Sequence, residues 1–177
     1  MKKYINLSLI YAVLGLLAGV FYREFTKWNG FTGVTTLGKV HTHLFMLGMF
    51  LFLLVALFAQ NHDLEGQKSF RLFMKVHNIG LPLVAITMVA RGITQVLGTQ
   101  LSKGLNASIA GMAGIGHILV SIGIISLLLA LKKVVKDYNW PLKAQLLKTF
   151  RSVFLSSHEK AYSVKRGEIE ICERKNV

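Results

Sequence analysis

The chain has 177 residues, the size of one domain, with 53% hydrophobic and only 16% charged residues. Soluble domains usually carry about 25% charged residues, so this balance argues against an ordinary water-soluble fold. The formal net charge is +13, but Lys and Arg flank the long apolar runs and gather mostly after Leu131. Anionic lipid headgroups explain that placement, so we expect the lipid bilayer as a partner and no nucleic acid.

Two features of the sequence limit its chemistry. The single cysteine, Cys172, permits neither an intramolecular disulfide nor a cysteine metal cluster. The sequence contains no phosphate-binding glycine motif, zinc-protease motif or nucleophile elbow. Whether the protein is an enzyme therefore stays open, and candidate residues have to be sought inside the apolar segments.

The first apolar run begins after Met1-Lys2-Lys3 and resembles a signal peptide. It continues to Tyr22, however, and no small-x-small cleavage site follows it. We therefore expect a retained first membrane span. The four apolar segments are Tyr4–Tyr22, Val40–Gln60, Val76–Leu97 and Ile109–Leu131.

Each segment is close to the ~20 residues that a helix needs to cross a hydrocarbon layer of about 30 Å. Backbone hydrogen bonds must be satisfied within such segments, and the segments are too long for barrel strands. The predicted fold class is therefore all-α, an integral membrane four-helix bundle.

The short connections carry unequal numbers of basic residues, which predicts the orientation. The richer side should face the cytoplasm, so both termini are expected there. The richer side carries Lys2, Lys3, Lys68, Arg71, Lys75, Lys132, Lys133 and Lys136, and the other side carries Arg23, Lys27, Lys39 and Lys103.

The residues after the fourth span are polar and basic, with one amphipathic stretch. Over Leu142–Leu155, apolar residues share one helical face while lysines and an arginine lie elsewhere. This pattern favours a helix on the cytoplasmic membrane surface, and the alternative is a solvated linker helix. We expect a transmembrane bundle over residues 1–136 and a basic cytoplasmic tail over residues 137–177, ending in a mobile polar segment.

Ionisable residues inside the spans are the candidate functional residues, because a charge near the bilayer centre costs about 2.5–3.5 kcal/mol. In the third span, His77 shares a polar and small-residue stripe with Gly80, Val84, Thr87, Arg91 and Gly98, which should face protein. In the fourth span, Ala110, Gly114, His117 and Ser121 share a face that we expect to point His117 into the bundle. The candidates are His41, His43, His77, Arg91 and His117.

The depths of these residues suggest one cluster. His41 and His43 lie about 200° apart around their helix, so both cannot face the same ligand, and the sequence does not choose between them. One of them, together with His117 and Arg91, forms a reasonable cluster in the outer part of the bundle. His77 lies near the inner surface without an obvious partner, where we expect a second cofactor-ligand site or a structural hydrogen-bond donor. Two imidazoles from different helices suit the iron of a b-type haem, with Arg91 neutralising a propionate.

Two motifs carry a resemblance to a known family. His41-Thr42-His43-Leu44-Phe45-Met46-Leu47-Gly48 and His77-Asn78-Ile79-Gly80-Leu81-Pro82 resemble runs in small membrane proteins related to the catalytic subunit of haem-copper oxidases and nitric oxide reductases. The chain also looks like an uncharacterised family of small four-span bacterial membrane proteins. The resemblance implies haem iron held by histidine and a bacterial cytoplasmic membrane. The chain lacks the further histidines of a copper centre, which makes oxygen reduction with proton pumping improbable.

Three functional hypotheses follow. The first is a haem b protein for electron transfer or diatomic gas binding, in which His41 or His43 and His117 ligate iron. A redox partner or a homodimer would fit this hypothesis. The second is a transport module in which the histidines and Arg91 line a path for protons, a metal ion or a small anion. The third is a structural or partner-binding membrane subunit.

Overall fold

The computed structural model describes residues 2–137 and Arg151. The chain divides into two units, Met1–Val135 and Lys136–Val177, and the fold given below is that of the first. The amphipathic helix expected over Leu142–Leu155 lies outside the described residues, apart from Arg151, which is helical and exposed.

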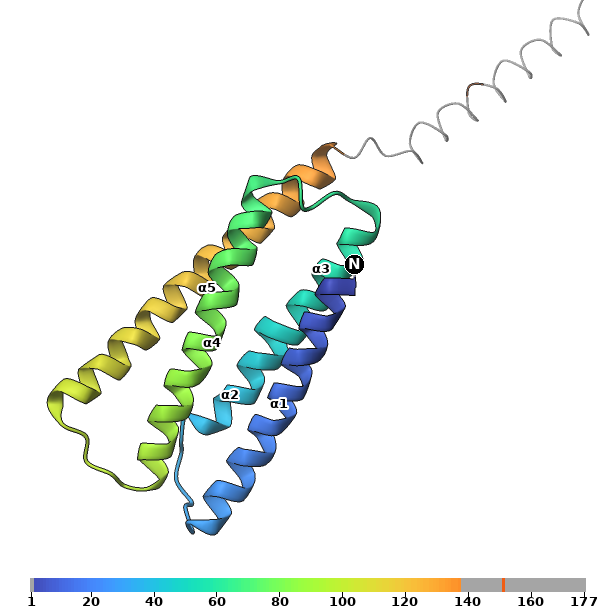
Figure 1. The fold of residues 1–177 in the computed structure, drawn as a ribbon. Coiled ribbons are helices and arrows are strands. Elements are labelled where there is room, and N and C mark those ends of the chain that lie inside the picture. The colour runs from blue at the N-terminus through green and yellow to red at the C-terminus, as the bar shows by residue number, and fades with distance from the viewer. Residues whose placement is uncertain (1, 138–150, 152–177) are drawn as a thin grey trace, which may run out of the picture. The chain divides into compact units, whose positions relative to one another are not determined.

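The first unit is built from helices (Figure 1). In the described ranges they form four continuous helical segments long and apolar enough to cross a membrane, as the sequence predicted, and no strand occurs there. The helices are α1 (Lys2–Trp28), α2 (Leu37–His43), the π-helix η1 (Leu44–Phe50), α3 (Leu51–Asn61), α4 (Lys68–Val96) and α5 (Lys103–Asp137). The second span is α2, η1 and α3 joined end to end, over Leu37–Asn61. The apolar surface also fits a lipid environment, since Leu9, Leu16, Leu17 and Val20 of α1 are each at least 60% exposed.

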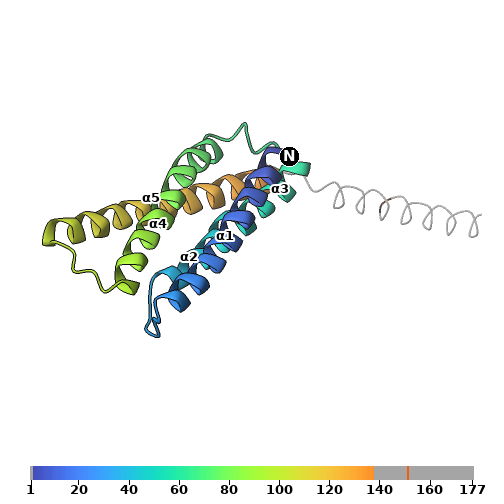
Figure 2. The same ribbon diagram turned by 60° about the horizontal axis from the view of Figure 1, so that its bottom comes forward.

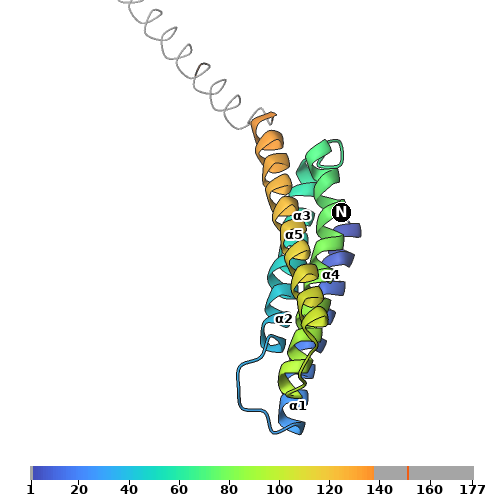
Figure 3. The same ribbon diagram turned by 90° about the vertical axis from the view of Figure 1, so that its left-hand side faces the viewer.

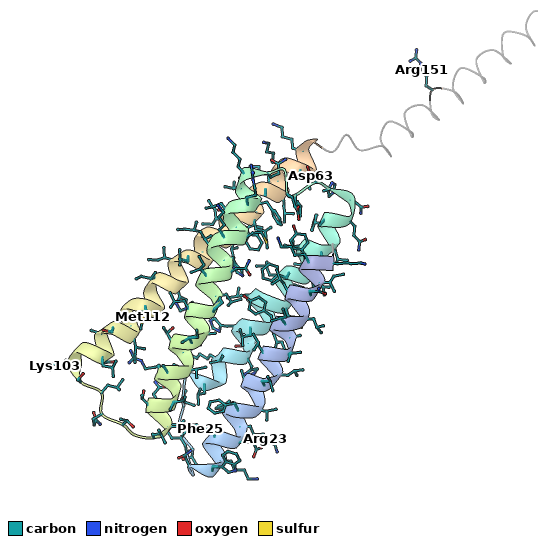
Figure 4. The ribbon with its side chains drawn as sticks, in the orientation of Figure 1. Arg23, Phe25, Asp63, Lys103, Met112 and Arg151 are labelled. Carbon is teal, nitrogen blue, oxygen red and sulfur yellow. The ribbon has the colours of Figure 1, made fainter. Side chains whose placement is uncertain are left out.

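Successive spans run in opposite directions (Figure 1). The connections α1–α2 and α4–α5 lie at one end of the bundle, and the α3–α4 connection lies at the other, beside the N-terminus. Figure 4 labels Arg23 and Lys103 at the first end and Asp63 at the second. We call these the Arg23 end and the Asp63 end. Which of them faces the cytoplasm stays a prediction from the charge pattern.

Helix α1 packs against the second span by matching large side chains with small ones. A Cβ atom on Gly48 would lie 2.4 Å from Cγ of Tyr11, so the Tyr11 ring occupies the space that a larger residue would need. Glycines allow two helices to approach closely where no hydrophobic force drives them together in lipid. The matched pairs are Tyr11 with Gly48, Gly15 with Phe45, Gly19 with His41 and Tyr22 with Gly38.

Helices α4 and α5 make backbone contact through glycines (Figure 3). A Cβ atom on Gly80 would lie 2.9 Å from the backbone nitrogen of Val120 and 3.1 Å from the carbonyl oxygen of Gly116. A Cβ atom on Gly123 would likewise lie 3.0 Å from Cβ of His77. By contrast, Gly104, Gly111 and Gly114 have no such neighbours within 4 Å. Figure 2 shows that the N-terminal part of α5 diverges from α4.

The second span contains a seven-residue π-helix, η1, which composition did not predict. At its end the Leu51 N–H bonds to the carbonyl oxygen of Gly48, whereas in an α-helix it would bond to that of Leu47. Side chains from two other helices donate to carbonyl oxygens in η1. Ser8 Oγ donates to Met49 O over 2.8 Å, and His77 Nε2 lies 2.9 Å from Leu47 O. The π-helix is thus held by α1 and α4, and π-helices are frequent at functional sites.

The contact between α4 and α5 predicts the effect of one added methyl group. In a helix Ala is favoured over Gly by about 1 kcal/mol, but at Gly80 the new Cβ would press on the backbone of α5, which cannot move aside as a flexible side chain can. We expect Gly80→Ala to lower the thermal stability of the detergent-solubilised protein, at a cost of about 1–3 kcal/mol. Gly104→Ala, in open space, should keep or raise it. Equal melting temperatures for the two variants would contradict this packing.

Candidate functional site

Two histidine rings from separate spans lie side by side. His43 is the last residue of α2 and His117 lies on α5. Their ring centres are 6.3 Å apart and their planes are almost perpendicular, at 85°. Of the five ionisable residues predicted to matter, these two are brought together.

The hydrogen bonds of the two rings select the tautomer of each neutral imidazole. His43 Nδ1 lies 2.9 Å from the carbonyl oxygen of Lys39, and His117 Nδ1 lies 2.7 Å from that of Ala113. A carbonyl oxygen only accepts, so each neutral ring must carry its proton on Nδ1. Each Nε2 then holds a lone pair, and neither has a hydrogen-bond partner among the described residues. This is the form in which histidine binds metals through Nε2, with the other nitrogen oriented by a carbonyl.

The His43–His117 pair is open to the surroundings of the bundle. His43 is half-buried and His117 is exposed. Gly114 lies one turn before His117, with no atom within 4 Å of the place where its Cβ would be. No group of three or more His, Cys, Asp or Glu residues that could hold a metal occurs in the described part of the chain. The pair therefore offers two protein ligands and open space beside them.

His41 lies on a different side of the second span. Its ring packs against Gly19 of α1, and its centre is 6.3 Å from that of Phe45. Its Nδ1 is buried and has no hydrogen-bond partner in the described ranges. The structure therefore separates His41 from His43, as their angular positions on one helix require.

His77 is fully buried in the core and holds the second span. Its Nε2 must donate to the carbonyl oxygen of Leu47, and its ring packs against those of Phe52 and Phe73, with centres 5.8 and 5.0 Å away. Its Nδ1 is buried without a hydrogen-bond partner in the described part of the bundle. Sequence reasoning left His77 without a partner because the acceptor is a backbone carbonyl, which no residue type reveals.

Arg91 is not brought to the His43–His117 pair. Its guanidinium donates to the carbonyl oxygen of Asn106 at 3.4 Å, at the Arg23 end of the bundle. His117 follows Asn106 by 117 − 106 = 11 residues, which is roughly 16 Å along a helix at 1.5 Å per residue. Among the described residues, the hydrogen bond of Arg91 thus goes to the start of α5 and not to the His43–His117 pair.

The predicted face of the fourth span was wrong. We expected Ala110, Gly114, His117 and Ser121 to face the bundle, but all four are exposed. The buried line instead includes Ile109, Gly116, Val120, Gly123 and Leu127. The physical reason is the backbone contact with α4, which only a glycine line can make. The heptad spacing of Gly116 and Gly123 was the signal that could have shown it.

These features define a class: an all-helical protein whose described residues form four potential membrane spans, with two imidazole rings from separate spans lying 6.3 Å apart. The chain belongs to the family described as "Protein of unknown function (DUF2871)", whose model matches residues 1–134. The match covers the bundle and every candidate residue. No curated protein and no solved structure matches the chain.

The bond between His77 and Leu47 predicts a loss of stability in His77→Phe. A phenyl ring fills a similar volume but cannot donate, so the buried carbonyl loses its partner, at a cost of about 1–3 kcal/mol. We expect a lower melting temperature in detergent, whereas His117→Phe, at an exposed position, should leave it almost unchanged. If His77→Phe is as stable as the unsubstituted protein, this hydrogen bond does not hold the π-helix.

Proposed function

We propose that the protein binds a b-type haem between His43 and His117. The observation that carries the proposal is the spacing of the two rings, whose centres are 6.3 Å apart. Metal–imidazole bonds of about 2.0 Å on opposite sides of one ion place two ring centres roughly 6 Å apart. Both rings also have Nδ1 bonded to a carbonyl, which leaves Nε2 as the ligand atom.

The number of protein ligands favours haem over a bare metal ion. A structural zinc site usually takes four protein ligands, and a catalytic one takes three. The described residues offer no group of three. Haem supplies its own in-plane nitrogens, so two axial imidazoles are enough. The His41–Gly48 and His77–Pro82 motifs also resemble those of haem-copper oxidase relatives. That resemblance implies haem iron held by histidine, and it supports the haem proposal independently of the ring geometry.

The residues of the chain would hold and orient the group. The carbonyl oxygens of Lys39 and Ala113 fix the tautomer and the orientation of the two rings, and the π-helix that follows His43 is anchored by His77 and Ser8. When bound, the haem would supply one-electron chemistry. If His43 and His117 both hold the group, electron transfer is the function that fits best, whereas gas binding would fit a group held by one of them. We place this activity in the cytoplasmic membrane, with both termini in the cytoplasm and a redox partner.

The visible spectrum of the purified protein tests the proposal. Protein made in cells supplied with haem precursors should show a Soret band that His43→Ala and His117→Ala each reduce by at least about tenfold, since each removes an axial ligand. His41→Ala is the matched control, because His41 faces α1, and it should keep the band.

Two results would overturn the haem proposal. One is a colourless protein that gains no Soret band on titration with hemin. The other is a band that survives both His43→Ala and His117→Ala. A colourless protein that binds copper through the same two histidines would favour the metal-transport hypothesis instead.

The open space beside His117 gives a steric prediction. A large ring at Gly114 should occupy the room that a flat macrocycle needs, while leaving the bundle intact, because no atom lies within 4 Å of that site. We expect Gly114→Phe to lose haem and keep its elution volume in detergent. Gly104→Phe, equally free of neighbours, should keep haem. Haem retention by both variants would place the macrocycle elsewhere.

A further inference from the structure

A polar cavity lies at the Arg23 end of the bundle, where α4 connects to α5. Its volume is about 310 Å³, and the polar side chains that matter here are Arg91, Gln95, Thr99, Gln100 and Asn106. No aspartate or glutamate lines it. A cavity with a guanidinium and no carboxylate favours an anion as its ligand.

Most N–H groups of the Arg91 guanidinium have no acceptor among the described residues. Its one hydrogen bond to a described residue goes to the carbonyl oxygen of Asn106, at 3.4 Å. The ion pair found in the described part of the chain joins two other residues, Arg23 and Glu24. Arginine has five N–H donors and no acceptor, arranged in a planar fork that matches phosphate and carboxylate oxygens. Arg91 can therefore present several donors to an anion without breaking an internal pair.

The side-chain amide of Gln95 is oriented by the start of the second span. Its Oε1 accepts from the backbone N–H of Thr36 at 2.9 Å and from the Thr35 hydroxyl at 3.2 Å. The oxygen end is thus fixed against α2, which leaves the NH₂ end as a pair of donors with no acceptor among the described residues. Thr35 is itself buried, and its single hydroxyl proton is shared between Gln95 Oε1 and the carbonyl oxygen of Gly92, which lies 3.1 Å away. This amide is therefore a preorganised donor beside Arg91.

We infer that this cavity binds a phosphate group through Arg91 and Gln95. Arg–phosphate contacts are often bidentate, and oriented amide donors add to them. The cavity lies at the end of a membrane span next to the exposed Leu97, which is where phospholipid headgroups lie. Free phosphate from solution carries the same chemistry. The site is separate from the His43–His117 pair and does not depend on haem.

Two binding measurements on the full chain identify the source of the phosphate. The first is the shift in melting temperature with sodium phosphate, compared with sodium chloride at equal ionic strength, in a neutral detergent. The second is native mass spectrometry of the protein after release from nanodiscs of phosphatidylglycerol. The comparison is protein from a preparation of an uncharged diacylglycerol with neutral detergent. Retained phosphatidylglycerol indicates a headgroup site, and a phosphate-specific shift indicates a soluble ligand. Either result supports the inference.

The variants test the assignment to residues. Arg91→Gln should weaken binding by about tenfold or more, and Arg91→Lys should restore only part of it because the fork is lost. Arg23→Gln is the matched control, since Arg23 lies at the same end with 82% of its side chain exposed and paired with Glu24. It should bind as tightly as the unsubstituted protein.

If the Arg91 variants fail to fold, Gln95→Glu provides a second test of phosphate binding in this cavity. The substitution keeps an oxygen for Thr36 and places a carboxylate in the cavity, which should repel the anion and abolish binding. The inference is overturned if neither probe binds, if Arg23→Gln loses as much affinity as Arg91→Gln, or if Gln95→Glu binds normally. The Soret band should be unchanged in all these variants, so this result and the haem result are independent.

Discussion

Polar side chains inside this bundle find their hydrogen-bond partners almost entirely on the backbone. In hydrocarbon an unsatisfied polar group costs several kcal/mol, and carbonyl oxygens are the acceptors at hand. Ser8, His43, His77, Thr87 and His117 all bond to carbonyl oxygens. Because carbonyls only accept, this constraint decides which nitrogen of each of these histidines carries the proton. It leaves His43 and His117 with free Nε2 lone pairs and His77 with a structural bond.

The π-helix η1 supplies two of these carbonyl acceptors, so the same hydrogen bonds hold the second span against its neighbours. At the end of η1 the Leu51 N–H bonds to Gly48 O and not to Leu47 O, so Leu47 O is available to His77, while Met49 O accepts from Ser8. His43 immediately precedes η1, so the same anchored segment positions the ring that meets His117. On the other side of His77, Gly123 brings α5 close to α4. The core histidine, the π-helix and the exposed histidine pair thus form successive parts of one interface.

The sequence predicted the four spans well, because long apolar runs have few alternatives. Of the stripe predicted in the third span, His77, Gly80, Val84 and Thr87 are buried, whereas Arg91 is half-buried and Gly98 is exposed. The sequence could not choose between His41 and His43, since both lie at similar depth and only the neighbouring helices distinguish their faces. The buried face of α5 was missed because small residues occur on two of its sides, and only contact with Gly80 selects one. The π-helix and the oriented amide of Gln95 depend on backbone partners, which residue patterns do not reveal.

The most direct test of the central claim is electron paramagnetic resonance of the oxidised, haem-loaded protein, which reports the axial ligands of the iron. Two imidazoles with nearly perpendicular planes, as in the 85° arrangement of His43 and His117, should give a strongly anisotropic low-spin ferric signal. Removing either histidine should convert it to a high-spin signal. A high-spin signal in the unsubstituted protein, or a low-spin signal unchanged in His43→Ala and His117→Ala, would contradict the account.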